Sequence, residues 1–212
     1  MLKQDLLLRR DLPRGIQPMR VRKTVAACVG VGLMVVLAGP AMAQYRQGSE
    51  MQTSWGVYVE GGTTLEGRSK SDVATVGVTY NFGPRREMWG GEVTTHGDFF
   101  VSNWRAQRQF SGAQTYTQIG AIANARYRFD AGASPWFMDL GIGLTLFDGY
   151  YETDSRRFST QFQFTEVLAL GRNFGASGVH EVSLRLQHVS NGGIREPNPG
   201  ENLVKLRYAY RF

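Results

Sequence analysis

Over most of its length the chain alternates apolar and polar residues in segments of about ten residues. In one of them, Val182, Leu184 and Leu186 are separated by Ser183 and Arg185. Because successive side chains of a β-strand point to opposite faces, each such segment would have one apolar and one polar face. The pattern predicts an all-β chain of eight strands. The expected strands lie at 55–60, 73–82, 88–101, 115–129, 136–147, 160–170, 180–190 and 203–212.

Three features favour a membrane barrel over a soluble β-sandwich, which would also alternate. The polar faces carry charges and glycine in nearly every segment, which suits a narrow barrel interior. Aromatic residues such as Trp55, Trp89 and Trp136 lie near segment ends, where barrels place interfacial girdles. The connections alternate between short (83–87, 130–135, 173–178) and long (61–72, 102–114, 148–159, 191–202). We therefore predict one domain over residues 44–212, an eight-stranded antiparallel transmembrane β-barrel with long loops on the outer side.

The N-terminal part has the order of a secretory signal peptide. Residues 19–23 are mainly basic, residues 24–39 are apolar, and Ala41-Met42-Ala43 is a small-x-small cleavage site. The apolar run is shorter than the roughly 20 residues that a membrane-spanning helix needs. We expect residues 1–43 to be a signal peptide. Met19 is an alternative start, in which case residues 1–18 are an upstream mis-start.

Removal of this leader changes the charge of the protein. The whole chain has 24 Lys and Arg against 18 Asp and Glu, and residues 1–43 hold seven of the basic and two of the acidic residues. The remaining 17 basic and 16 acidic groups nearly cancel, so nothing indicates a nucleic-acid partner. The single cysteine, Cys28, lies in the leader, which excludes disulfide or thiol chemistry in the exported protein.

The segment 180–190 carries a pair of chemically active residues. Its apolar side continues into His188 and Ser190, whereas the opposite side carries Arg185 and Gln187. An arginine facing lipid would cost roughly 2–4 kcal/mol near the midplane, so the apolar side must be the one that faces lipid. His188 and Ser190 are therefore expected at the outer end of an outward-running strand, at the height of lipid ester bonds.

A serine becomes a nucleophile when a base lies within hydrogen-bond reach and a third group orients that base. Two positions along a strand separate Cα atoms by about 6.6 Å, which lets an imidazole approach a hydroxyl. The pair therefore predicts hydrolysis of a lipid ester. A His-x-Ser pair is common by itself, and a His and Ser merely solvated by head groups is the alternative interpretation.

The residues around this pair resemble the motif of the lipid A 3-O-deacylase (PagL) family. The resemblance covers residues 188–202 and rests on His188-Val189-Ser190-Asn191, Gly193, Pro197-Asn198 and Gly200. It implies an eight-stranded outer-membrane barrel of Gram-negative bacteria with a His, Ser, Glu triad at its outer-leaflet rim.

By this resemblance Ser190 would attack the 3-position ester of lipid A in lipopolysaccharide and release a 3-hydroxyacyl chain. His188 would be the general base, and Asn191 with the backbone of Gly193 would stabilise the oxyanion. The family implies no cofactor and no metal. A homodimer stays open.

The third member of the triad departs from the family pattern. The family has Glu fourteen residues after its His, and this chain has Asn202 there and Glu201 one residue earlier. In an unbroken strand Asn202 shares the outward face and Glu201 points inward. A bulge at Pro199-Gly200 would turn Glu201 outward. We expect Glu201 to orient His188, with Asn202 as the alternative and Glu196, in the loop, as a third candidate.

Two other functions fit parts of the pattern. Outer-membrane phospholipase A has a similar His-x-Ser-Asn-Gly stretch and an Asn as orienting group, but it is a twelve-stranded, Ca²⁺-dependent barrel, and twelve strands exceed what 169 exported residues can supply. A non-enzymatic structural or adhesive barrel would instead use its long loops and would not depend on Ser190.

Overall fold

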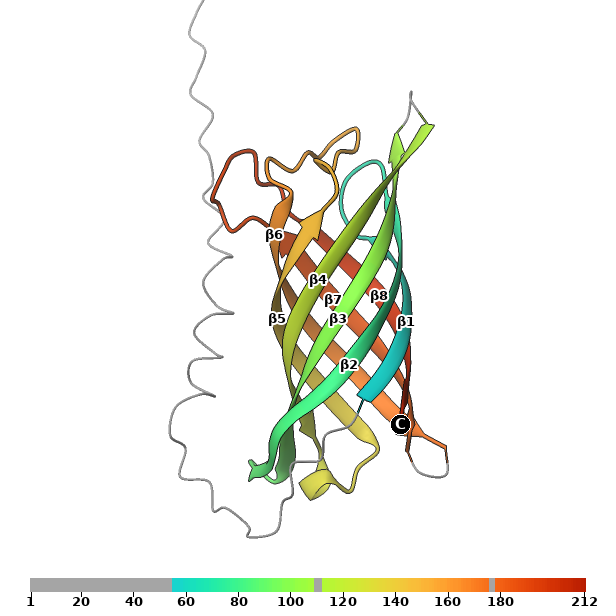
Figure 1. Cartoon of the computed structure of the whole chain (residues 1–212), viewed down its shortest axis with the longest axis vertical. Coiled ribbons are helices and arrows are strands. Elements are labelled where there is room, and N and C mark those ends of the chain that lie inside the picture. The colour runs from blue at the N-terminus through green and yellow to red at the C-terminus, as the bar shows by residue number, and fades with distance from the viewer. Residues whose placement is uncertain (1–54, 109–111, 176–177) are drawn as a thin grey trace, which may run out of the picture.

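The computed structural model describes residues 55–108, 112–175 and 178–212, and these form a closed, all-β barrel of eight antiparallel strands (Figure 1). The expected leader 1–43 and the first residues after it lie outside the described ranges. Among the described residues, no helix is long and apolar enough to cross a membrane. The strands are β1 (Trp55–Thr64), β2 (Ser71–Met88), β3 (Gly91–Arg108), β4 (Gly112–Arg128), β5 (Trp136–Phe147), β6 (Phe162–Phe174), β7 (His180–Ser190) and β8 (Glu201–Arg211).

Closure of the barrel depends on the pairing of its first and last strands. Each strand pairs with its neighbours in sequence, and β1 pairs with β8 from Gly56↔Arg211 to Thr64↔Leu203. A closed sheet has no free edge, so the strand backbone finds its hydrogen-bond partners inside the protein. This is the condition that a sheet must meet in lipid.

Three connections differ from the sequence expectation. The long loop expected at 61–72 is reduced to residues 65–70, because β1 and β2 stay paired as far as Thr63↔Asp72. The turn expected at 83–87 lies inside β2, where the register to β3 shifts between Phe82 and Arg86, and the chain reverses at Trp89 and Gly90, which both have positive φ. Much of the long loop expected at 102–114 is strand, because β3 and β4 stay paired as far as Arg108↔Gly112. Pairing between two strands needs no apolar face, so it continues beyond the residues that alternate.

The outer face of the barrel is apolar and its inner face is polar, as expected. In β7, Val182, Leu184 and Leu186 are 40%, 55% and 49% exposed on the outside, whereas Arg185 and Gln187 are buried inside. The parity that places His188 and Ser190 outside is thereby confirmed.

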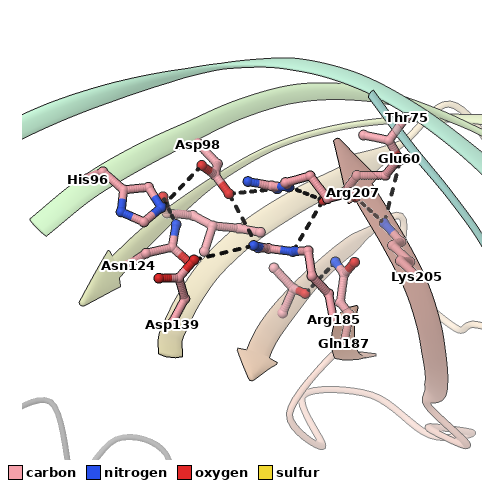
Figure 2. A network of polar contacts seen from close by, with 12 residues as sticks. Glu60, Thr75, His96, Asp98, Asn124, Asp139, Arg185, Gln187, Lys205 and Arg207 are labelled. Carbon is pink, nitrogen blue, oxygen red and sulfur yellow. Dashed lines mark hydrogen bonds and ion pairs between the residues drawn. The ribbon is translucent and has the colours of Figure 1, made fainter. Parts of the chain in front are cut away.

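The middle of the barrel holds a network of ion pairs (Figure 2) beside a buried cluster that includes Tyr58, Phe100 and Ile122. Arg207 lies between two carboxylates, with Nε 2.6 Å from Glu60 and Nη2 2.9 Å from Asp98. Arg185 also contacts both carboxylates, at 3.2 and 3.4 Å, and Lys205 lies 3.2 Å from Glu60. All five side chains are nearly inaccessible to solvent, so each charge depends on its partners.

A second group of ion pairs continues the network toward the opposite end from Ser190. Arg126 binds Asp139 through two nitrogens, at 2.7 and 2.9 Å, and donates to Glu181 at 2.6 Å. Arg185 Nη1 links the two groups, 3.8 Å from Asp139. The charged lumen that the alternating pattern predicts is therefore a connected network across several strands.

The end of the barrel at which β7 finishes and β8 begins, called the site end below, has a mainly aromatic and aliphatic interior instead. The segment between β5 and β6 folds into the mouth and buries Tyr151 and Phe158. Trp104 packs edge-on against Tyr151 at a centroid distance of 5.4 Å. The buried cluster also includes residues from β2, β3, β4, β5, β7 and β8. Its members are Val73, Trp104, Ala106, Tyr116, Phe147, Tyr151, Phe158, Val189 and Leu203.

The interior network predicts a large loss of stability when one partner is removed. Arg207→Ala removes a positive charge that offsets the buried negative charges of Glu60 and Asp98. We expect it to lower the free energy of unfolding by about 3–5 kcal/mol. Arg105→Ala removes an exposed arginine on the outer surface of β3 and should cost less than about 1 kcal/mol. Urea unfolding in lipid vesicles measures both. Equal losses in the two variants would contradict a stabilising network.

Candidate functional site

His188 and Ser190 lie on the outer surface at the last positions of β7. Both are half-buried, and Val189 between them is fully buried in the apolar cluster of the site end. An inward Val189 forces its two neighbours outward, because side chains alternate along a strand. The structure therefore places both predicted residues on one face, next to each other along the strand.

The partner of the His188 ring is Asn202. These residues face each other across β7 and β8, and His188 Nδ1 lies 2.7 Å from Asn202 Oδ1. The amide oxygen can only accept, so this contact requires a proton on Nδ1 and leaves Nε2 as the basic nitrogen.

The expectation that Glu201 orients His188 is wrong in its geometry. Glu201 pairs with Val189, is 1% exposed and points into the barrel, where Tyr151 Oη donates to its carboxylate at 3.2 Å. Regular pairing of β8 begins at Glu201 itself. The bend before it therefore does not turn this side chain outward, and strand parity decides in favour of Asn202.

Gly200 makes room for the His188 ring. Its φ is +62°, and a Cβ atom there would lie 2.9 Å from His188 Cε1 and 3.3 Å from Nε2. Any other residue would be strained by the backbone conformation and would push the ring away. The bend before β8 thus serves to seat the histidine.

No hydrogen bond joins Ser190 and His188 among the described side chains. The residues are two positions apart on one strand, which corresponds to about 6.6 Å between Cα atoms. Hydrogen bonds between a nucleophile and its base are often long in free enzymes and shorten when substrate binds. The structure therefore brings the two residues to one surface without forming the catalytic contact.

The two expected oxyanion donors are engaged elsewhere. Gly193 donates its backbone N–H to Asn191 Oδ1 at 2.9 Å, and Asn191 Nδ2 donates to Ser159 Oγ and to the Arg195 carbonyl at 3.0 and 2.7 Å. Asn191 is buried and holds the loop 191–200 against the segment between β5 and β6. In this conformation neither group is free to donate to an oxyanion at Ser190.

Two carboxylates of the site were not predicted from the sequence, and Glu66 is the first of them. It lies in the loop between β1 and β2, and its Oε1 accepts a hydrogen bond from Asn202 Nδ2 at 2.7 Å. Its other oxygen, Oε2, lies 2.5 Å from Arg156 Nη2. The hydrogen bond from Asn202 holds the pKa of Glu66 below its usual value, and Arg156 adds to this effect. No motif marks Glu66, because only barrel closure brings this loop beside β8.

Another carboxylate neighbours His188 on the opposite side. Glu166 of β6 is the cross-strand partner of His188, and it interrupts the apolar outer face of β6. Among the described residues, no group of three or more His, Cys, Asp and Glu side chains is arranged to hold a metal ion. The groups at the site are thus a hydroxyl, an imidazole, an amide and two carboxylates on the outer surface and rim.

Comparison with known proteins gives three findings. The sequence profile of the lipid A 3-O-deacylase (PagL) family matches residues 74–211. A protein of Bordetella bronchiseptica described as lipid A deacylase PagL is 39% identical over 77 residues, which cover 36% of this chain and 42% of that protein. The match thus spans less than half of that relative. A crystal structure of the outer membrane enzyme PagL has a TM-score of 0.60 and 23% identity, covering 73% of this chain and 98% of that chain, which shows a shared fold.

The geometry predicts opposite effects for the two adjacent candidates in β8. Asn202→Ala removes the acceptor for His188 Nδ1–H and should lower the rate of lipid-ester hydrolysis by at least about tenfold. Glu201→Gln keeps the buried shape and should leave the rate within about threefold, because Glu201 contacts neither His188 nor the outer face. Fatty-acid release by the folded barrels measures both. A larger loss for Glu201→Gln would restore the original expectation.

Proposed function

The chain belongs to the lipid A 3-O-deacylase (PagL) family, and we propose that it is a serine esterase of the Gram-negative outer membrane that hydrolyses the 3-O-acyl ester of lipid A. The single observation that carries the mechanism is the His188–Asn202 hydrogen bond on the outer face beside Ser190. It supplies an oriented base next to a hydroxyl on the surface that meets lipid. A water-soluble substrate would have no reason to approach from that side.

In the proposed reaction Ser190 Oγ attacks the ester carbonyl carbon while His188 Nε2 takes the hydroxyl proton. The tetrahedral intermediate collapses as the bond between the carbonyl carbon and the sugar 3-oxygen breaks, and His188 returns its proton to that oxygen. Water then attacks the acyl-serine by the same route and releases a 3-hydroxy fatty acid. Asn202 keeps the proton of His188 on Nδ1 throughout.

Stabilisation of the oxyanion by Asn191 or Gly193 would require a rearrangement of the loop after Ser190. Asn191 or the Gly193 N–H would have to exchange its present partner to donate to the developing charge. Gly192 and Gly193 of this loop have positive φ, a conformation that other residues rarely adopt. The carbonyl oxygen of the bound substrate, as it becomes negatively charged, would be the new hydrogen-bond acceptor.

The substrate would enter laterally from the membrane. The outer surface below His188 is apolar along β7, with Leu184 and Leu186 about half exposed, and this band would hold acyl chains. The reacting pair stands at the rim above it, where the ester bonds of the leaflet lie. This position favours a membrane lipid with its head group at the outer side, as lipid A has.

A phospholipase-like specificity is the second candidate, since Asn202 is the kind of orienting residue that outer-membrane phospholipase A carries. The closed eight-stranded wall lacks the twelve strands of that family. A purely adhesive barrel would leave the His188–Asn202 pair without a role. No comparison supports a homodimer, and we do not propose one.

Mass spectrometry of lipid A from cells that express the barrel tests the proposal. The wild-type protein should convert lipid A to a form that lacks one 3-hydroxyacyl chain. Ser190→Ala and His188→Ala should abolish the conversion while the barrels keep heat-modifiable migration on gels. Unchanged lipid A at full outer-membrane levels of the wild type would refute the proposal. Hydrolysis of glycerophospholipids instead would support the second candidate.

A further inference from the structure

We propose that Glu66 is a positioning residue of the site, which supplies through the amide of Asn202 the carboxylate that the family carries at position 202 itself. The chain of contacts runs from His188 Nδ1 to Asn202 Oδ1 at 2.7 Å and from Asn202 Nδ2 to Glu66 Oε1 at 2.7 Å. The inference rests on the proposed esterase function. The carboxylate that is absent from position 202 would thus be supplied by the loop between β1 and β2.

The carboxylate fixes which way the Asn202 amide is turned. An ionised carboxylate can only accept hydrogen bonds, so the NH₂ group of Asn202 must face Glu66 and its oxygen must face His188. That oxygen in turn holds the proton of His188 on Nδ1. Without Glu66 the amide could rotate and present NH₂ to the ring, which would favour the opposite tautomer and remove the base from Nε2.

Glu66 also supplies charge that Asn202 lacks. When His188 takes the serine proton it becomes an imidazolium, and a neutral amide offsets none of that charge. The hydrogen bond from Asn202 is the main cause of the lowered pKa of Glu66; Arg156 adds to it, and the charge of His188 acts in the same direction. Glu66 is therefore ionised at neutral pH, and its negative charge is available to offset the positive charge of the His188 imidazolium.

Glu66 is held in place by Arg156. The guanidinium lies 2.5 Å from Glu66 Oε2 and donates through Nη1 to the carbonyls of Pro199 and Gly200 at 3.0 and 2.6 Å. Arg156 thus ties the loop of Glu66 to the bend that seats the His188 ring. It contacts the oxygen of Glu66 that faces away from Asn202.

A loop tether is the competing explanation for these contacts. Glu66 and Arg156 would then merely fasten three loops together, and the hydrogen bond to Asn202 would have no effect on the histidine. The two explanations differ in one respect. A carboxylate placed directly at residue 202 would replace a positioning role, but it would not replace a tether.

The experiment compares kcat and KM for lipid A in mixed micelles among full-length folded barrels. Glu66→Gln removes the charge with little change of shape. We expect kcat to fall roughly tenfold to a hundredfold with little change in KM, the range found for carboxylates that stand behind functional histidines in metal sites. The double variant Glu66→Gln with Asn202→Glu restores the family arrangement, and its kcat should recover at least about tenfold over Glu66→Gln.

Glu152→Gln is the matched control. Glu152 also lies in a site-end loop, is paired with an arginine (Arg108, 3.1 Å) and has a side chain 43% exposed, against 46% for Glu66. It should keep wild-type kcat. Ser190→Ala, measured in parallel, tests the proposed function separately and should be inactive.

The outcomes separate the hypotheses. An inactive Ser190→Ala with a fully active Glu66→Gln would overturn the role of Glu66 and leave the esterase proposal standing. A loss in Glu66→Gln that the double variant fails to restore, with both barrels heat-modifiable, would assign Glu66 to a tether and also overturn the inference. Wild-type activity in Ser190→Ala would refute the proposed mechanism itself.

Discussion

The structure depends on the satisfaction of backbone hydrogen bonds within a closed sheet. A strand in lipid has no water to pair with, so the pairing of β1 with β8 is required for all the others. Closure in turn gives every strand an inner and an outer face. Polar residues on the inner face must then find partners across the lumen, which Glu60, Asp98, Arg185 and Arg207 do.

The filling of the lumen changes along the barrel, and this change positions the site. Buried ion pairs are found in the middle, whereas a mainly aromatic cluster occupies the site end beneath the last residues of β7. Val189 and Leu203 anchor both strands in that apolar cluster. The outward residues His188 and Asn202 are consequently carried on two paired strands, and the loop residue Glu66 contacts the far end of the Asn202 amide.

The acid of the site departs from the expected family pattern. Position 202 holds Asn in place of the expected Glu, and its uncharged amide oxygen lies 2.7 Å from His188 Nδ1. A carboxylate on a different loop, Glu66, meets the free end of the amide, and Arg156 holds that carboxylate. Under the proposed role of Glu66, the loops around the bend before β8 would belong to the site as well as to the rim.

Much of this protein follows from its sequence. Alternation with period two determined the all-β class, the eight strands and the outward position of His188 and Ser190, because side-chain direction in a strand depends only on parity. Parity also pointed Glu201 inward, and the expected bulge that would have reversed it does not form. The turn at Trp89 and the long β3–β4 hairpin could not be predicted, since backbone pairing continues where the side-chain pattern ends. Only the tertiary structure decided that Glu66, distant in sequence, reaches Asn202, because barrel closure sets which loops become neighbours.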